Sequence, residues 1–179
     1  MQPDLEVVQI GHGQSFKAWE HGYPFHTVRW HFHPELEVHH VVETSGHYYI
    51  GDFIGEFAPG NLVLTGPNLP HNWVSHVAEG ETVPLRSRVL QFPEDLLVRI
   101  AETFPDTGGF SGLFALSRRG SLFSDACSRH CAPILAELVQ ARGPRRASLF
   151  LDLLANLAAD SGARGRTRRR ISLKSSRMT

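Results

Sequence analysis

The sequence predicts a mainly β fold, an antiparallel β-barrel over residues 1–92, followed by an α-helical hairpin within residues 93–160. Up to residue 92, short apolar runs alternate with glycine, proline and asparagine, which is typical of short antiparallel strands. After Gln91 the apolar residues recur every three or four positions, which is the period of an amphipathic helix. The chain of 179 residues is long enough for one domain with a sizeable core.

Seven short segments are expected to form the strands of this barrel. In chain order they are residues 7–10, 25–32, 36–42, 48–50, 62–64, 73–74 and 87–92. Clusters of turn-forming residues separate them, at 21–22, 44–46, 51–52, 59–60 and 66–70. Strands of this length and spacing form an antiparallel barrel or sandwich.

Pro34 interrupts the segment that joins His33 to Glu37. A proline removes one hydrogen-bond donor from a sheet ladder, so we expect a bulge or an edge position there. A bulge changes the phase of the alternation between the two faces of a strand. Periodicity alone therefore leaves open whether Glu35 or Glu37 faces inward.

Three helices are expected after the strands. The first covers residues 93–104, where Pro93 and two acidic residues precede an apolar stripe. The second begins at an N-cap on Ser124 and runs to residue 142, with a kink or break at Pro133.

The third helix, residues 145–160, follows the turn at Gly143 and Pro144, so the last two helices form a hairpin. Its apolar stripe consists of Leu149, Phe150, Leu153, Leu154 and Leu157. Two partners for this stripe stay open, the barrel of the same chain and a second copy of the chain.

Residues 161–179 form a basic tail with seven of the eighteen lysines and arginines and no acidic residue. This composition predicts disorder. Two explanations stay open: an arm that contacts phosphates without sequence preference, or a chain end produced by truncation or a shifted reading frame.

The charge of the rest of the chain excludes one class of function. Residues 1–160 contain eleven basic and eighteen acidic residues, a net charge of minus seven, which argues against nucleic-acid binding by this part. Cys127 and Cys131 lie four residues apart on an expected helix, which suits neither a disulfide framework nor a zinc ribbon. No segment resembles a signal peptide or a membrane span, so we expect a cytoplasmic protein without membrane contact.

The main functional signal is a set of candidate metal ligands, His31, His33, Glu37 and His71. Imidazole nitrogens with one carboxylate oxygen suit a divalent transition metal, and the residue types do not choose among Zn, Ni, Fe, Mn and Cu. Two alternatives stay open: a polar pocket that binds a ligand without a metal, and histidines that are simply hydrogen-bonded in the core.

The spacing of these four residues resembles the two motifs of the cupin superfamily. The first cupin motif, His-x-His and then Glu, matches residues 31–37, and the second, a Pro-x-Gly turn or close variant and then His, matches Pro59, Gly60 and His71. The resemblance implies a cupin-like barrel, the double-stranded β-helix, and favours Glu37 over Glu35 as the inward carboxylate.

This chain departs from the cupin pattern at two positions. Thr44 stands where the first motif ends on a glycine, with Gly46 two residues on. Asn61 stands where an acidic residue often follows the Pro-Gly turn. A glycine at such a turn tolerates positive φ, so the turn after this strand is expected to shift toward Gly46.

The match is closer to one branch of that superfamily, the N-terminal sensor domains of AraC-type transcription regulators. It lies in residues 30–37, 51–64 and 66–73, within a resemblance that covers about residues 5–160. The resemblance implies a small-molecule effector or a metal as ligand and a homodimer through the helical hairpin. DNA contact is expected only through a helix-turn-helix domain of about a hundred residues that this chain does not contain.

Four further residues are candidates for the wall of a ligand pocket because they neighbour the motif histidines. They are Trp30, Glu35, His39 and Trp73. The sequence favours a sensor domain, with a stand-alone metal-dependent cupin dioxygenase or isomerase as the alternative. We identify no catalytic residue, because the histidines and the glutamate would be used as ligands.

Overall fold

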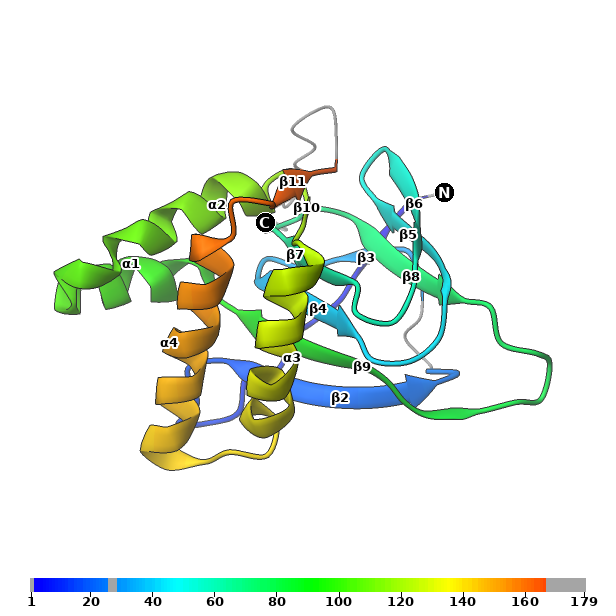
Figure 1. Cartoon of the computed structure of the whole chain (residues 1–179), viewed down its shortest axis with the longest axis horizontal. Helices are drawn as coiled ribbons and strands as arrows, with labels where there is room; N and C mark the ends of the chain where they lie inside the picture. The colour runs from blue at the N-terminus through cyan, green and yellow to red at the C-terminus, as the bar shows by residue number, and fades with distance from the viewer. Residues whose placement is uncertain (1, 26–28, 167–179) are drawn as a thin grey trace, which may run out of the picture.

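The chain folds into three layers: two β-sheets that face each other and a group of helices on the outer face of one sheet (Figure 1). A computed structural model describes residues 2–25 and 29–166. Figure 1 shows the helices gathered on one side of the molecule and strands β5, β6 and β8 on the other. The predicted mainly β architecture is confirmed.

The strands form two separate sheets. The five-stranded sheet has the order β1 (Asp4–Leu5), β3 (His31–Phe32), β8 (His71–Ser75), β5 (Gly46–Ile50) and β6 (Phe53–Phe57). The six-stranded sheet has the order β11 (Arg164–Gly165), β10 (Ser121–Leu122), β7 (Leu62–Thr65), β4 (Leu36–Val41), β9 (Val83–Phe92) and β2 (Lys17–Tyr23). Neighbouring strands are antiparallel except for the parallel pair β1 and β3.

The prediction of a closed antiparallel barrel is wrong. Among the described residues no hydrogen-bonded strand pair joins the two sheets, so the fold is a sandwich with free edges. The edge strands β1 and β11, and β10 next to β11, have only two residues each, too few for a ladder that would continue from one sheet into the other.

Five strands were missed, and one predicted strand does not form. The missed strands are β1, β2, β6, β10 and β11, of which β2 and β6 are the longest, whereas residues 7–10 form no strand. The turn predicted at 21–22 lies inside β2, where the register against β9 shifts between His21 and Tyr23. β2 contains polar residues and Gly22, so its composition resembles a turn although its backbone pairs with β9.

Residues 33–35 form the corner that joins the two sheets. β3 ends at Phe32 in the five-stranded sheet, and β4 begins at Leu36 in the six-stranded sheet. Pro34 therefore marks a break between two strands rather than a bulge within one. Of the strand predicted over 25–32, only β3 forms, and residues 26–28 lie outside the described part.

The helices follow the last long strand. They are α1 (Glu94–Thr103), the 3-10 helix η1 (Pro105–Phe110), α2 (Ser111–Ser117), α3 (Asp125–Leu138) and α4 (Gly143–Ala159). Ser124 caps α3 as predicted, because its hydroxyl accepts a hydrogen bond from the amide of Cys127. α3 continues through Pro133, so the predicted break does not occur, and Pro144 lies in the first turn of α4.

The core has two parts. A large apolar cluster lies between the six-stranded sheet and the helices, and a smaller one between the two sheets includes Val41, Ile50 and Trp73. The apolar stripe of α4 is buried in the large cluster of its own chain. This stripe is therefore not a free surface for a second copy of the chain.

The last described residues of the chain form a short strand. Arg164 and Gly165 pair with β10 as strand β11, so the disorder predicted for 161–179 is wrong at these positions, and residues 167–179 lie outside the described part.

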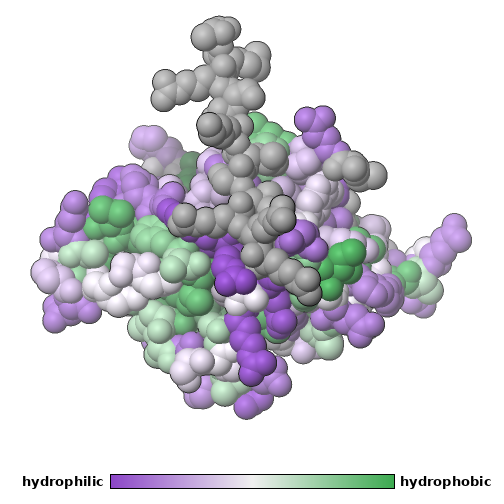
Figure 2. Space-filling model, turned by 90° about the horizontal axis from the view of Figure 1, so that it is seen from above, coloured by the Kyte–Doolittle hydropathy of each residue, from purple (hydrophilic) through white to green (hydrophobic). Residues whose placement is uncertain are grey.

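The helices in the described ranges give no sign of a membrane span. None of the helices there is long and apolar enough for one. The face seen in Figure 2 mixes hydrophilic and hydrophobic residues.

His40 gives the fold a defined acid sensitivity. It is buried on the face of β4 that carries Leu36 and Val38 toward the helices, opposite Arg88 of β9. Burial, with a smaller contribution from Arg88, lowers the pKa of His40 to about 4. As the pH falls from 6.5 to 4, the unfolded chain binds a proton that the folded chain does not, so the free energy of unfolding decreases.

We expect the substitution His40→Leu to reduce this acid loss by about 2 kcal/mol between pH 7 and pH 4.5. Urea unfolding at the two pH values measures it. His130→Leu, at an exposed position on α3, is the matched control and should leave the pH dependence unchanged. The same acid loss in His40→Leu as in the parent protein would contradict this assignment.

Candidate metal centre

Strand pairing and the corner at residues 33–35 bring the four predicted ligands together. His31 on β3 lies directly opposite His71 on β8, with ring centroids 4.4 Å apart. His33 lies in the corner, and Glu37 is on β4 of the other sheet. The cluster therefore lies between the two sheets, at the point where the chain passes from one to the other.

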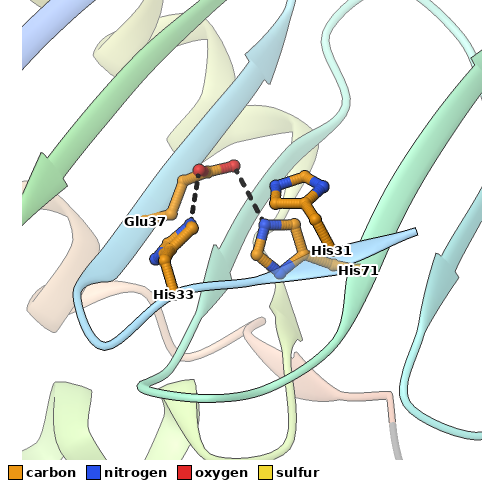
Figure 3. A group of neighbouring side chains, drawn as sticks. All are labelled: His31, His33, Glu37 and His71. Atoms are coloured by element: carbon orange, nitrogen blue, oxygen red, sulfur yellow. Dashed lines mark hydrogen bonds and ion pairs between the residues drawn. The ribbon is translucent and has the colours of Figure 1, made fainter. Parts of the chain in front are cut away.

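One potential ligand atom from each of His31, His33, Glu37 and His71 lies within 4.8 Å of the others. Figure 3 shows the three rings and the carboxylate directed toward a common centre. His33, Glu37 and His71 are buried, and His31 is half-buried at the edge of the cluster. A single ion can therefore contact all four side chains.

Backbone carbonyl groups fix the orientation of all three rings. The Nδ1 atoms lie 2.8 Å from Arg29 O for His31, 3.2 Å from Glu35 O for His33 and 2.7 Å from Leu69 O for His71. A carbonyl oxygen only accepts hydrogen bonds, so each Nδ1 carries a proton, and Nε2 is the atom of each ring that would bind a metal. Metal-binding histidines commonly have this arrangement.

The Glu37 carboxylate is fixed by two side chains that are not themselves in the ligand set. Gln91 Nε2 donates to Oε2 at 3.0 Å, and His39 Nδ1 lies 3.2 Å from Oε1. Burial alone would raise the pKa of Glu37, but the neighbouring His71, His33 and His39 rings hold it well below its usual range. Glu37 is therefore an anion in the folded protein.

His39 supports Glu37 as a neutral ring. Its burial lowers the pKa of His39 to about 4. Because the carboxylate can only accept, Nδ1 donates to Glu37 and Nε2 accepts from the hydroxyl of Ser87 at 3.0 Å. The ring also stacks on Trp73, with centroids 4.0 Å apart.

The cluster has short contacts that require a positive charge between the atoms. His33 Nε2 lies 3.0 Å from Glu37 Oε2, and His31 Nε2 lies 3.2 Å from Glu6 Oε2. A lone pair that faces a carboxylate oxygen is repelled unless a proton or a cation lies between them. His71 Nε2 is buried without a hydrogen-bond partner in the described structure. These donors fit a divalent transition metal.

A cavity of about 40 Å³ adjoins the cluster. Its wall is formed by Glu6, Trp19, His21, Phe25, His31, Glu37, His39, Asn72, Trp73, Arg86, Val89 and Gln91. Space of this size accommodates a few water molecules or a very small ligand. Glu6, Trp19, His21 and Phe25 are half-buried, so the cavity communicates with solvent.

Of the four predicted pocket residues, His39 and Trp73 line the cavity, whereas Glu35 and Trp30 do not. The break at Pro34 explains why Glu35 does not line the cavity. The Glu35 carboxylate lies on the Nδ1 side of the His33 ring, 3.6 Å from Nδ1. Sequence reasoning missed Glu6, Arg86 and Gln91. None of them belongs to a recognisable motif, and only strand pairing brings them to the site.

The sequence matches one protein family, described as the AraC-like ligand binding domain, over residues 15–173. No curated protein matches the chain. Three solved structures of ToxT from Vibrio cholerae are similar in fold, and at 9 or 10% identity they show the fold alone.

An apo ToxT variant has a TM-score of 0.56 and 9% identity, with 81% of this chain and 55% of that chain covered. ToxT bound to (E)-4-(8-methylnaphthalen-1-yl)but-3-enoic acid has a TM-score of 0.53 and 10% identity, with coverages of 80% and 54%. ToxT bound to an unsaturated fatty acid has a TM-score of 0.52 and 10% identity, with coverages of 84% and 54%. The chain thus spans about half the length of these structures.

Proposed function

Because this chain belongs to the AraC-like ligand binding domain family, we propose that it senses a small molecule through a cavity built on a divalent metal ion. His31, His33, Glu37 and His71 would be the ligands. The observation that supports this proposal best is the direction of the three rings: each Nδ1 faces a backbone carbonyl, which leaves Nε2 as the atom that would bind a metal.

The metal is one of Zn, Ni, Fe, Mn or Cu, because nitrogen donors with one carboxylate suit all of them. When bound, it supplies a Lewis-acid position that an oxygen or nitrogen atom of an effector can occupy. Glu37 is aligned by Gln91 and His39, which is the kind of outer support that tunes metal affinity in known sites.

The effector of this chain is a small one. ToxT has been solved with an unsaturated fatty acid and with a naphthalenyl butenoic acid, both much larger than a few water molecules. The cavity here has about 40 Å³, whereas pockets for drug-sized ligands have several hundred. The volume of the cavity therefore favours a ligand of a few non-hydrogen atoms beside the metal.

Occupancy of the site would act on the corner between the sheets. The proposed ligands come from β3, β8, the corner and β4, so a metal and its effector would tie the five-stranded sheet to the six-stranded sheet. Any shift between two states is limited by the difference in affinity of the ligand for them.

A homodimer and a DNA contact are the remaining parts of this proposal. Because the apolar stripe of α4 is buried on its own sheet, a dimer would use the outward faces of α3 and α4. DNA contact would belong to a separate domain, since residues 1–160 have an excess of acidic residues.

Metal titration tests the proposed function. We expect the chelated protein to bind one equivalent of Zn²⁺ and its unfolding midpoint to rise by several degrees at saturation, because the ion binds only the folded state. Calorimetric titration gives the stoichiometry, and thermal unfolding gives the shift. A midpoint that stays the same with Zn²⁺, Ni²⁺, Fe²⁺, Mn²⁺ and Cu²⁺ would contradict the proposal.

A further inference from the structure

Arg86 is a buried cation on the wall of the cavity and lies outside the proposed ligand set. It is on β9, with 2% of its surface exposed. The amides of Val42 and Glu43 both donate to the Arg86 carbonyl, at 2.8 and 3.3 Å, so the pairing of β9 with the end of β4 is irregular here. Arg86 and the next residue, Ser87, are therefore both buried.

The guanidinium of Arg86 has few partners for a group with five N–H donors. Nη2 donates to the Trp73 carbonyl at 2.7 Å, and the rings of Tyr23 and Phe57 lie 5.4 and 6.0 Å from the guanidinium carbon. Nε is buried with no hydrogen-bond partner among the described residues. Burial lowers the pKa of Arg86 to about 10, which leaves the side chain charged at neutral pH.

No carboxylate in residues 2–25 and 29–166 forms an ion pair with Arg86. A charge that is buried without an opposite charge is costly. The neighbouring Arg88 differs, because its Nε lies 3.3 Å from Glu20 Oε2. Arg86 thus lacks the counter-ion that a neighbouring arginine on the same strand has.

The charges of the cavity wall show what a loaded site would attract. Glu6 and Glu37 contribute two negative charges to the wall and Arg86 one positive charge, a sum of minus one for these three side chains. A divalent ion at the centre changes the sum from minus one to plus one. A monovalent anion would neutralise the loaded cavity, and the volume of about 40 Å³ restricts it to a few atoms.

We propose that the effector is a small monocarboxylate whose carboxylate group is bound by the Arg86 guanidinium beside the metal. The planar fork of a guanidinium matches the two oxygens of a carboxylate. A phosphate dianion would leave the cavity with excess negative charge, and a neutral ligand would leave Arg86 unpaired. This inference rests on the proposed metal site.

Acetate binding tests the inference, with acetamide as the neutral ligand of the same shape. Saturation-transfer NMR on the zinc-loaded full chain measures both dissociation constants, and metal content is measured separately on each sample. We expect acetate to bind with a dissociation constant on the order of 1 mM and acetamide at least about tenfold more weakly. Equal binding of the two ligands would overturn the proposal.

Variants then assign the anion site to Arg86. Arg86→Met keeps the long apolar stem and should weaken acetate binding at least about tenfold with unchanged zinc content. Arg88→Met, two residues along β9, is the matched control and should bind acetate like the parent protein. If Arg86→Met does not fold, Arg86→Lys, which keeps the charge but loses the fork, should weaken binding by a smaller factor. If Arg86→Met folds and binds acetate like the parent protein, the proposal is overturned. If only Arg86→Lys folds, parent-like acetate binding by that variant overturns it.

The two proposals fail in different ways. If the parent protein binds no zinc, the proposed metal site is wrong, and the assignment of Arg86, which rests on that site, is wrong with it. With one zinc ion per chain and no acetate binding, the metal site stands and the assignment of Arg86 is wrong.

Discussion

The double substitution His31→Ala and His33→Ala is expected to reduce the metal content of the purified protein from about one ion per chain to a trace. It removes two of the four donors and leaves Glu37 and His71, and two ligands rarely retain a divalent transition metal through purification. Elemental analysis of the purified protein measures the loss.

The matched control replaces two histidines that lie together outside the site. His47 is half-buried and His76 is exposed, and their rings are in contact, with Nδ1 of His47 2.9 Å from Nε2 of His76. His47→Ala with His76→Ala should leave the metal content at about one ion per chain. Equal metal in the parent protein and in both double variants would contradict the assignment of His31 and His33.

The substitution Gly46→Ala is expected to lower the free energy of unfolding by about 3 kcal/mol or more. Gly46 is the first residue of β5 and pairs with both β8 and β6. A Cβ atom at this position would meet the Val74 carbonyl oxygen and would lie 2.9 Å from the Cα atom of Ser75 and 3.0 Å from the ring of Phe57. The first two obstacles are backbone, so the strands would have to move apart.

Gly112→Ala is the control for this prediction. Gly112 lies in α2, and a Cβ atom there would meet nothing within 4 Å. Alanine is favoured over glycine in a helix, so stability should stay the same or rise by up to about 1 kcal/mol. Urea unfolding of the two variants compares them. A free energy of unfolding in Gly46→Ala like that of the parent would show that β5 and β8 are not paired this closely.

Gly46 also explains the departure from the expected motif. The first cupin motif ends on a glycine, which tolerates a turn with positive φ. Because this chain has Thr44 there, the sequence predicts that Gly46 takes the role of that glycine. In the structure Thr44 itself has φ of 75°, and Gly46 is not among the residues with positive φ. The glycine is needed for close strand contact rather than for the turn.

The four candidate ligands could be predicted because their signal is local. His31, His33 and Glu37 lie within seven residues, and His71 follows a turn at a spacing that resembles a known motif. Helices α1, α3 and α4 were also predictable, because amphipathic periods and the N-cap at Ser124 act within a few residues, whereas η1 and α2 were missed. Metal binding by His31, His33, Glu37 and His71 is a prediction that the proposed measurements test.

The supporting residues could not be predicted, because their positions depend on pairing between distant segments. Gln91 reaches Glu37 across β4 and β9, 54 residues along the chain, and Glu6 reaches His31 from the segment that follows β1. Glu35 was misplaced for a related reason. Simple alternation assumes one continuous strand, whereas the corner at Pro34 sends the chain into the other sheet.

X-ray absorption at the zinc edge of the zinc-loaded protein tests the central claim most directly. The claim predicts three imidazole nitrogens and at least one oxygen at about 2.0–2.1 Å, with the outer-shell scattering of imidazole rings. A zinc ion surrounded by oxygen atoms alone, or by sulfur from Cys127 and Cys131, would contradict it.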